Sequence, residues 1–489
     1  MTRHHTPRRN HLQAVILPLL ALVAALVAWH PTTPAVGADA DATPPNVVWI
    51  IADDLGWGEL SCQNPDTDVP TPQIDRIAEA GARFTQAYVT APFCAASRAG
   101  MLTGRYQTRF GFELNPIGHV NDEPGVGLPR SERTIATLLR QQSGYATGLV
   151  GKWHLGATSP FHPHRHGFDE FFGFAHEGHF YVPPPWPGMV TWLRRRSLPG
   201  GGEGLWRSPD GRRYETTHMG HEEPDYDAFN PLLRGSQPVH EPEYLTDAFT
   251  REAVDFIGRH RERPFFLVVA HLAVHSPLQA PEQDVRRFDH IENPQRRIFA
   301  AMLHRLDEGV GAILDALAAH DLERDTIVVF MSDNGGPTRE LTSSNGPLRD
   351  EKGRVYEGGL RVPMLVRWPG VLEPGRVIDQ PVISLDLGAT FLAVAGAEPP
   401  QPLDGADLRT LTDAEGVERT FFWRVGPERR ALRRGDWKLV SHRQQPWELF
   451  HLGNDPGEQN DLAAGFPERV QTLERDWLEI EGEMVDPLW

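Results

Sequence analysis

The chain has 489 residues, enough for two to three domains, and its 66 acidic and 48 basic side chains give a formal net charge of −18. This acidity argues against a nucleic-acid-binding protein, and 40% hydrophobic with 23% charged residues describes an ordinary globular protein. The two cysteines, Cys62 and Cys94, allow one disulfide or two free thiols.

Residues 1–40 have the layout of a secretory signal peptide. Three arginines precede an apolar run over residues 12–29, and small residues at 38–40 suit a cleavage site. A membrane anchor is the alternative, but a run of about 18 residues that contains a proline is short for a span. We therefore expect an exported protein, periplasmic or secreted, with no stable membrane anchor. The pair Arg8-Arg9 leaves general secretion and twin-arginine export both open.

Four continuous apolar runs predict strands that are buried on both faces, as in a parallel sheet. They cover Val47–Ala52, Ala146–Val150, Phe265–Ala270 and Thr326–Met331. Capped or amphipathic segments between these runs predict helices that start at Thr71-Pro72, Ser131 and Thr246, and a long helix that includes Ile298 to Leu317. This alternation predicts an α/β fold with a large mixed, mostly parallel sheet flanked by helices.

The pattern changes twice further along the chain. From His176 to Glu243 it dissolves into Pro, Gly, Trp and Arg, and we expect loops that face a substrate there. A strand over 360–368 and a helix over 386–396 come next, and a proline-rich stretch near residue 400 marks a boundary. Short strands near 420–423, 437–441 and 447–452 and a helix near 469–481 complete the chain. We expect an α/β domain over residues 45–400 and a C-terminal α+β subdomain over residues 401–489.

Polar side chains follow the predicted strands, at the edge where open α/β sheets bind ligands. The oxygen donors are Asp53, Asp54, Asp333 and Asn334, and the cationic groups are Lys152, His154, His275 and Lys352. Adjacent carboxylates at a buried strand end repel each other unless a cation lies between them. The oxygen donors suit a hard divalent cation such as Ca²⁺ or Mg²⁺, whereas a zinc site would favour His where Asn334 stands.

Cys94 lies in the segment Phe93–Arg105, whose small residues let the chain turn sharply into a helix, with Arg98 four residues further on. A helix N-terminus carries unsatisfied N–H groups that suit an anionic ligand. The alternative is a buried cysteine that packs as a small hydrophobic residue. A disulfide with Cys62 would exclude a chemical role for Cys94.

In their order along the chain, these segments resemble the type I sulfatases of the alkaline phosphatase superfamily. The matching segments are Cys94–Arg98 with Thr103–Arg105 (C-x-P-S-R and T-G-R in the family), Gly151–Gly156 (G-K-W-H-L-G), Asp53-Asp54, His275–Leu278, Ser332–Gly336, Lys352 with Glu357–Gly359, and Trp447–Glu458. The matches run from Val47 to Leu462. Because all of these segments occur in the same order as in the family, the resemblance is specific. One position differs from the family pattern: Ala96 stands where the family usually has Pro. This position lies within the motif that the family's maturation enzyme recognises when it modifies the cysteine.

The resemblance implies an alkaline-phosphatase-like fold, a catalytic first domain and hydrolysis of sulfate monoesters of a carbohydrate or an aryl alcohol. It implies that a formylglycine-generating enzyme converts Cys94 to formylglycine (3-oxoalanine), whose hydrate attacks sulfur. Asp333 would accept the proton of the attacking hydroxyl. Ca²⁺, or Mg²⁺ in its place, would be held by Asp53, Asp54, residue 94, Asp333 and Asn334.

The resemblance also implies roles for the remaining site residues. Arg98 and Lys152 would hold the formylglycine oxygens, while Lys152, His275 and Lys352 would bind the sulfate. His275 would protonate the leaving oxygen as a general acid. His154 would remove a proton from the second hydroxyl, which expels sulfate and restores the aldehyde.

Two other functions stay open from the sequence. Phosphate or phosphonate ester hydrolases of the same superfamily can share nearly the same site. If Cys94 stays a thiol or pairs with Cys62, the expected protein is an inactive one that binds sulfated glycans.

Overall fold

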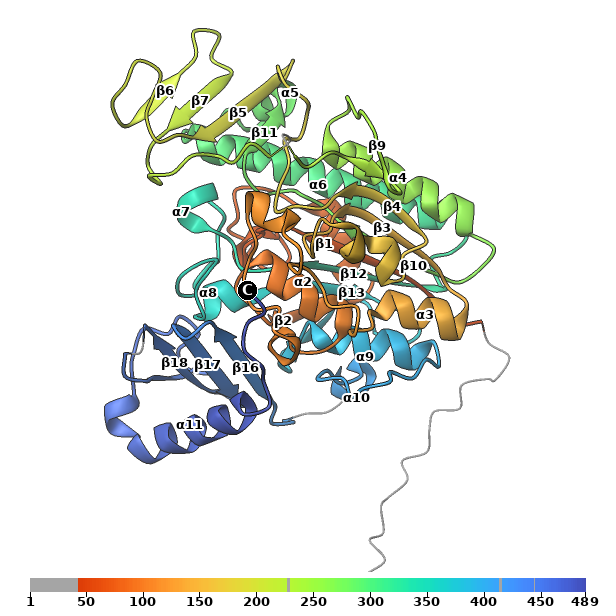
Figure 1. Ribbon diagram of the computed structural model, residues 1–489, viewed down its shortest axis with the longest axis vertical. Helices are drawn as coiled ribbons and strands as arrows, with labels where there is room; N and C mark the ends of the chain where they lie inside the picture. Colours follow the sequence, from red (N-terminus) through yellow and green to blue (C-terminus); the bar gives the residue numbers. More distant parts are fainter. Residues whose placement is uncertain (1–42, 227–228, 413–415, 444) are drawn as a thin grey trace, which may run out of the picture. The chain divides into compact units, whose positions relative to one another are not determined.

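An 11-stranded sheet is the centre of the part of the chain that the computed structural model describes, residues 43–226, 229–412, 416–443 and 445–489 (Figure 1). In spatial order its strands are β14 (Arg376–Ile378), β2 (Ala82–Tyr88), β13 (Arg361–Arg367), β12 (Thr326–Ser332), β1 (Asn46–Ala52), β10 (Phe265–Ala270), β3 (Ala146–Lys152), β4 (Glu170–Phe174), β8 (Leu233–Arg234) and β9 (Gln237–Pro238), while β15 (Val382–Ile383) pairs with β2. The run from β12 to β4 is parallel, and β13 and β8 are antiparallel to their neighbours. The predicted mixed, mostly parallel sheet is confirmed.

The four apolar runs form the middle of this sheet. β10 has the predicted limits, whereas β1, β3 and β12 each extend slightly beyond them. β2 and β4 were not predicted, because polar residues interrupt β2 and a glycine interrupts β4. In β13, the register with β2 shifts between Val362 and Met364. Pro363, which has no N–H to donate, therefore lies at an irregularity of the ladder.

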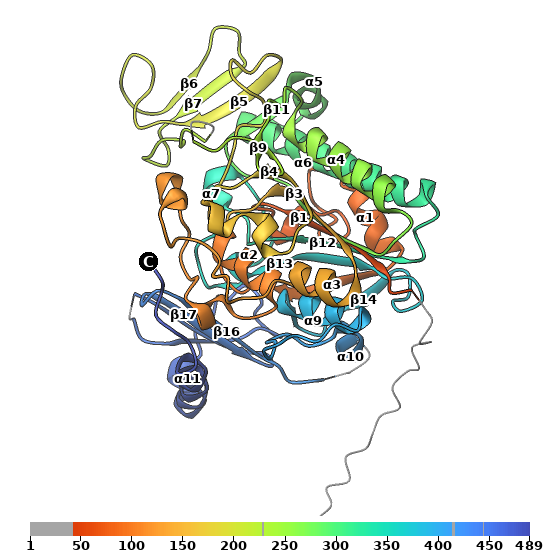
Figure 2. The ribbon, with the colours of Figure 1, turned by 45° about the vertical axis from the view of Figure 1, so that its right-hand side comes forward.

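Helices cover both faces of the sheet, in one layer on each side (Figures 1 and 2). One layer holds α1 (Pro72–Glu79), α4 (Leu245–His260) and α6 (Pro294–Ala319), and the other holds α2 (Cys94–Thr103), α3 (Ile135–Ser143) and α9 (Leu385–Val394). Val48 and Ile50 of β1 belong to the core under the first layer, and Val47 and Trp49 to the core under the second. A strand buried on both faces has to be apolar throughout, as β1 is. The shorter helices are α5 (Glu282–Val285), α7 (Thr338–Leu341), α8 (Glu357–Leu360) and α10 (Leu408–Thr412).

Two helices begin at other residues than the sequence predicts. The prediction places Ser131 at the start of α3, but this helix begins at Ile135, and the Thr134 hydroxyl accepts the capping hydrogen bond from the Thr137 N–H. Thr246, the predicted cap of α4, lies inside that helix, which begins at Leu245. At α3, Ser131 and Thr134 both offer a cap and Thr134 makes it, whereas α4 begins after Tyr244 without a side-chain cap.

The segment predicted to form loops contains strands, so that prediction is wrong in part. A second sheet has the order β11 (Leu278–Pro281), β5 (Met189–Arg194), β7 (Arg213–Thr216) and β6 (Leu205–Arg207). β5 pairs with β11, which lies far along the chain, and its residues Trp192 and Leu193 are buried. The strands are short and bounded by Gly, Pro and Arg, so no run is long enough to signal them.

The C-terminal part contains a third, antiparallel sheet. Its strands are β16 (Thr420–Val425), β17 (Arg429–Arg434), β18 (Trp437–His442) and β19 (Glu448–His451), and α11 (Pro467–Glu481) packs on it through Leu473 and Trp477. The predicted strands and last helix are present, whereas β17 was not predicted because four of its six residues are arginine. Residues 44–489 form one compact unit, and the division at residue 400 stays a prediction.

The signal peptide predicted over residues 1–40 lies outside the described residues. Within the described part, no helix has both the length and the apolar composition needed to cross a membrane.

A buried ion cluster fixes the C-terminal sheet to the segment that starts α8. Lys438 Nζ of β18 lies 2.8 Å from Glu357 Oε1 and 2.9 Å from Glu458 Oε1, and all three side chains are fully buried. Tyr88 donates its hydroxyl to Glu357 at 2.6 Å. Without the lysine, two carboxylates would face each other in the protein interior.

We therefore expect Lys438→Met to destabilise the protein by about 3–5 kcal/mol, because it leaves the buried Glu458 carboxylate without its cation. Urea unfolding followed by circular dichroism measures this change. Arg434→Met on the adjacent strand β17 is the control, since Arg434 is 43% exposed and its ion pair with Glu418 is worth at most about 1 kcal/mol. Equal stability of the two variants would show that the cluster does not hold this sheet.

Candidate active site

Polar side chains from separate strand ends meet at the carboxyl edge of the large sheet. Asp53 and Asp54 follow β1, Asp333 follows β12, and Lys152 ends β3. β1 lies between β12 and β10, and β3 is next to β10, so the strand order brings these residues together. Each of the four is at most 1% exposed.

The carboxylates surround a place suited to a cation. Asp53, Asp54, Cys94 and Asp333 each offer one ligand atom, and these atoms lie within 4.8 Å of one another. The Asn334 Nδ2 donates to Asp54 Oδ1 at 2.7 Å, while its buried Oδ1 has no hydrogen-bond partner among the described residues. An unpaired buried oxygen beside converging carboxylates needs positive charge. The residues present therefore fit a hard divalent cation.

Two fully enclosed cations lie against these carboxylates. Lys152 Nζ is 2.6 Å from Asp53 Oδ2. Arg98 donates from Nε to Asp333 Oδ2 at 2.9 Å, its Nη2 forms an ion pair with the same oxygen at 2.9 Å, and its Nη1 donates to the Lys152 carbonyl at 3.0 Å. Arg98 lies one turn into α2, so the helix that starts at residue 94 also orients this guanidinium.

A third cation, Lys352, marks the more open side of the site. Its Nζ is 2.7 Å from Asp54 Oδ1, and its side chain is 18% exposed. Burial alone would raise the pKa of Asp54, but the charges of Lys352 and His275 outweigh it and lower this pKa to about 2. Burial and the charge of Asp53 raise the pKa of Asp333 to about 6. Of these two carboxylates, Asp333 is the one that accepts a proton more readily.

Cys94 faces the carboxylates from the first position of α2. Its Sγ is 3.4 Å from Asp53 Oδ1 and the residue is 1% exposed, while the next N–H, that of Ala95, donates to Asn115 Oδ1 at 3.0 Å. Burial, followed by the charge of Asp53, raises the pKa of the Cys94 thiol. The thiol therefore stays protonated, whereas a cysteine nucleophile needs a lowered pKa. Cys94 and Cys62 are both free, so the disulfide that the sequence left open is not formed.

The two predicted histidines present different nitrogens. His275 Nδ1 lies 2.6 Å from the Ser276 carbonyl and so carries a hydrogen, while Nε2 is 3.7 Å from Asp54 Oδ2. β3 ends at Lys152, and His154 lies beyond it with a left-handed backbone φ of 58°. His154 Nε2 donates to the Pro116 carbonyl at 2.8 Å, and its buried Nδ1 has no partner among the described residues. Burial lowers both pKa values, that of His275 to about 3 although Asp54 opposes the shift.

The sequence did not predict the groups that hold the site residues in place through hydrogen bonds. Arg194, the last residue of β5, donates to Glu223 from Nε and Nη2, both at 2.8 Å. The same Nη2 reaches Ser276 Oγ at 3.1 Å, next to His275. Asn115 and Pro116, which hold α2 and His154, also carried no signal, because no strand end or motif precedes them in the sequence. The second sheet therefore reaches the site, as expected for a segment that faces a substrate, but it does so with strands where loops were predicted.

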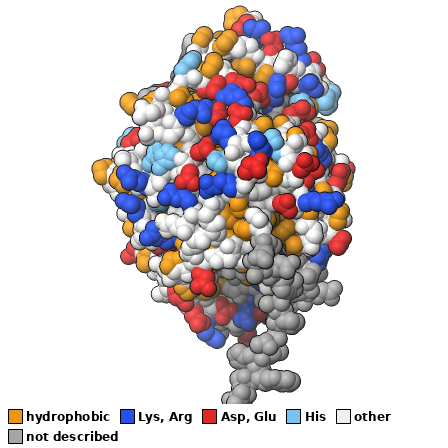
Figure 3. All heavy atoms as spheres, turned by 90° about the vertical axis from the view of Figure 1, so that its right-hand side faces the viewer, with side chains coloured by type: hydrophobic (Ala, Val, Ile, Leu, Met, Phe, Trp, Pro, Cys, Tyr) orange, Lys and Arg blue, Asp and Glu red, His pale blue; other side chains and the backbone are white. Residues whose placement is uncertain are grey.

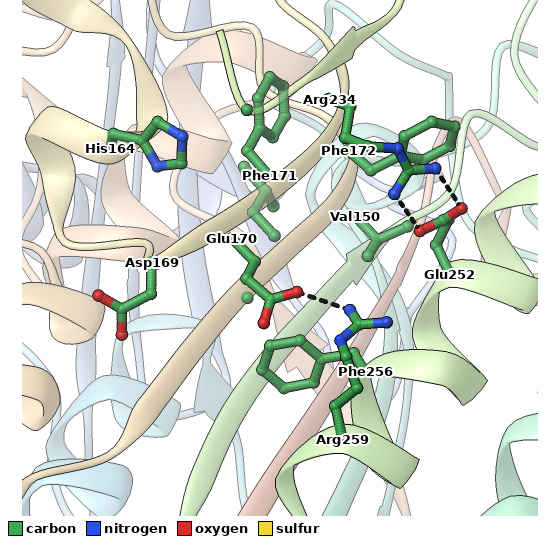
Figure 4. Close-up of a pocket in the computed structure, with 13 residues that line it drawn as sticks. Val150, His164, Asp169, Glu170, Phe171, Phe172, Arg234, Glu252, Phe256 and Arg259 are labelled. Atoms are coloured by element: carbon green, nitrogen blue, oxygen red, sulfur yellow. Dashed lines mark hydrogen bonds and ion pairs between the residues drawn. The ribbon is translucent and has the colours of Figure 1, made fainter. Parts of the chain in front are cut away.

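A separate pocket of about 440 Å³ lies away from these residues, between β4 and α4 (Figure 4). Phe172 and Phe256 contribute to its lining, and the ion pairs Arg234–Glu252 and Arg259–Glu170 border it. The molecular face that bears α3 and α4 has acidic and basic side chains mixed together (Figure 3). None of the predicted site residues lines this pocket.

The fold and the meeting of carboxylates with cations at the strand ends suit an enzyme that acts on an anionic group with the help of a divalent cation. Comparison with known proteins narrows this class. The Sulfatase family model matches residues 45–397, and the model described as N-sulphoglucosamine sulphohydrolase, C-terminal, matches residues 350–475. The chain therefore belongs to the sulfatase family, and the prediction of a sulfuric ester hydrolase is confirmed.

Individual relatives agree with this assignment. The chain is 31% identical to the N-acetylgalactosamine-6-sulfatase of Mus musculus, over 88% of this chain and 84% of that protein. It is 34% identical to the steryl-sulfatase of Mus musculus, over 78% and 67% respectively. Among solved structures, Ps i-CgsB in complex with k-i-k-neocarrahexaose is 33% identical with a TM-score of 0.78, over 91% of this chain and 95% of that one.

Proposed function

We propose that this protein removes sulfate from carbohydrates, with a nucleophile made by converting Cys94 to formylglycine and with Ca²⁺, or Mg²⁺, bound beside it. The observation that carries the proposal is that Cys94 points at three carboxylates and three fixed cations, yet burial raises its thiol pKa. A protonated thiol is a poor nucleophile. A nucleophilic role for residue 94 therefore requires that the thiol be converted to another group, such as an aldehyde hydrate. A carbohydrate substrate is supported by the names of two similar proteins, one a sugar sulfatase and the other bound to a neocarrahexaose.

Five positions would hold the cation: Asp53, Asp54, residue 94, Asp333 and Asn334. Together the cation and the aldehyde hydrate would supply an acidified hydroxyl nucleophile and charge neutralisation at the sulfate oxygens. Around them, Arg98 and Lys152 orient residue 94. Lys152, Lys352 and His275 would bind the sulfate. Asp333, one of the carboxylates close to residue 94, would accept the proton of the attacking hydroxyl.

The histidines would divide the remaining proton transfers. His275 keeps a hydrogen on Nδ1 for the Ser276 carbonyl, so its Nε2 is the nitrogen that delivers a proton to the leaving oxygen. A bound sulfate places negative charge beside this ring and raises its pKa, which favours the protonated form. His154 donates from Nε2 to Pro116, so its free Nδ1 is the basic nitrogen that removes a proton from residue 94.

We expect Lys352→Ala to lower kcat/KM for sulfate esters by roughly 10²–10³-fold, the usual effect of removing one positioned donor from an anionic transition state. The fold should persist, because the side chain is partly exposed and lies at the edge of the cluster. Steady-state kinetics and a thermal melt measure both quantities. Lys352→Arg keeps the charge and serves as the control. A fully active Lys352→Ala enzyme would show that sulfate binding is misassigned.

Mass analysis of the peptide that contains residue 94 tests the nucleophile directly. In active protein from its native host, we expect the mass of an aldehyde in place of the thiol. An unmodified cysteine in active material would refute the proposal. The same preparation is assayed on paired sulfate and phosphate monoesters, and far faster turnover of the phosphate esters would contradict the proposed reaction.

We also propose that the protein is exported, periplasmic or secreted, on the signal-peptide layout of residues 1–40. The first residue of the native protein, read by N-terminal sequencing, should lie just beyond residue 40. A native protein that retains residues 1–40 would contradict cleavage.

A further inference from the structure

Three arginines gather beside the open side of the active site, and we call Arg354, Arg429 and Arg443 the arginine cluster. Burial, followed by the charge of Arg354, lowers the pKa of Arg429, and Arg443 adds to this effect. Arg429 begins β17 and is the cross-strand neighbour of His442 on β18. Burial and the charges of Arg354 and Arg429 lower the pKa of His442 to about 4, so this ring adds no charge of its own.

A single residue separates this cluster from the catalytic groups. The Gly353 carbonyl accepts from Arg429 Nη1 at 2.8 Å, and the Gly353 N–H donates to the Pro92 carbonyl at 2.7 Å. Pro92 lies two residues before Cys94, and Gly353 directly follows Lys352. The C-terminal sheet lies next to α8 at this point (Figure 1). The Tyr356 ring stacks there on the His442 ring, with the ring centroids 4.9 Å apart. A group bound by the cluster would therefore lie next to a substrate in the active site.

The arginine cluster has weaker acidic partners than Arg434 on the same strand: Asp350 lies near Arg354, and Glu428 acts on Arg429. Within the described ranges, Arg429 makes no ion pair, and the nearest carboxylate oxygen to Arg354 is that of Asp350 at 3.9 Å. By contrast, Arg434 at the other end of β17 contacts Glu418 at 2.8 Å and Asp476 at 3.0 Å. Like charges placed together repel one another, and an anion bound between them removes the repulsion. The Arg354 side chain is 37% exposed and free to meet such an anion.

We propose that Arg354 and Arg429 bind a second anionic group of the substrate, a sulfate or carboxylate on the sugar next to the one whose sulfate is removed. This inference rests on the proposed function and narrows its substrate class to oligosaccharides that carry more than one anionic group. Guanidinium groups suit this task, because their N–H fork matches the paired oxygens of sulfate and carboxylate.

The test uses three trisaccharides as competitors of 4-nitrophenyl sulfate hydrolysis: a sulfated maltotriose, trigalacturonate, which carries carboxylates only, and neutral maltotriose. The double variant Arg354→Gln, Arg429→Gln should raise the inhibition constant of an anionic competitor by about tenfold or more, as for the loss of about 1.4 kcal/mol. Its KM for 4-nitrophenyl sulfate should change by a smaller factor. Comparison of the two anionic sugars tells whether sulfate or carboxylate is preferred.

Matched variants separate charge from structure. Arg434→Gln, on the same strand but with acidic partners, should leave all inhibition constants unchanged. The double replacement of Arg354 and Arg429 by Lys keeps both charges and should restore part of the affinity, which a structural defect would not allow. Inhibition constants equal to the wild type for both anionic sugars in the Gln variant would overturn the inference.

Isothermal titration calorimetry measures binding of the trisaccharides without any turnover, so it tests the arginine cluster even if the proposed function is wrong. If the wild-type protein hydrolyses neither 4-nitrophenyl sulfate nor any sulfated sugar, the proposed function fails. Binding of the same trisaccharides to wild-type and double-variant protein still decides the inference. Weaker binding of an anionic trisaccharide to the variant supports it, and equal binding contradicts it.

Discussion

Replacement of Cys94 by alanine should abolish sulfate ester turnover, with kcat lower by on the order of 10⁶-fold, the scale seen when a covalent nucleophile is removed. The remaining carboxylates and cations can still bind sulfate, so the loss should appear in kcat more than in KM. Cys94 is small and buried, and its removal should cost about 1 kcal/mol of stability. Steady-state kinetics with 4-nitrophenyl sulfate and a thermal melt give both numbers.

Two further variants identify the reason for the loss. Cys62→Ala should keep full activity, because Cys62 is not bonded to Cys94. Cys94→Ser supplies one hydroxyl but not the second one of an aldehyde hydrate, so we expect it to stall after at most one turnover. A Cys94→Ala enzyme with wild-type kcat would disprove that residue 94 is the nucleophile.

The sequence was sufficient for the parts of the site that follow buried strands. An apolar run that ends abruptly in carboxylates, as β1 does before Asp53 and Asp54, fixes both the strand and the edge on which the carboxylates lie. β12 repeats this pattern before Asp333 and Asn334. Because parallel strands bring their carboxyl ends to one edge, the meeting of these residues follows without knowledge of the strand order.

The sequence was insufficient wherever position depends on pairing across long stretches of chain. The arginines of β17 look like a surface segment, yet the strand lies between β16 and β18 and brings Arg429 to Gly353. β5 needs its distant partner β11 before Arg194 can reach Ser276. The direction of His154 depends on a left-handed backbone angle after β3, and residue spacing alone does not reveal such an angle. Arg429, Arg194 and His154 surround the centre of the site, where a substrate would make contact. The sequence therefore predicts the substrate preference less well than it predicts the class of reaction.

Removal of divalent cations by a chelator should inactivate the enzyme by roughly 10³-fold or more without unfolding it. Buried carboxylates without a cation would normally repel each other, but Lys152 and Lys352 already lie 2.6 Å and 2.7 Å from Asp53 and Asp54. Those contacts preserve the fold and at the same time turn both lysines away from a sulfate. The predicted loss is therefore one of catalysis, amounting to the several kcal/mol that a metal supplies to a charged transition state.

Stability measured with and without metal tests the cation site independently of activity. At a Ca²⁺ concentration 100 times the Kd, we expect about 2.7 kcal/mol of added stability, seen as a higher Tm. Asp54→Asn removes a ligand charge and should abolish this shift, whereas Asp210→Asn, an exposed aspartate on the second sheet's loop, should not. Ca²⁺ or Mg²⁺ should restore the chelated enzyme better than Zn²⁺, because Asp53, Asp54 and Asp333 offer carboxylate oxygens and Asn334 offers an amide oxygen where a zinc site would favour His. Full activity after exhaustive chelation, together with a Tm that does not respond to Ca²⁺, would contradict the cation site. The three carboxylates would then serve only as ion-pair partners of Lys152, Lys352 and Arg98.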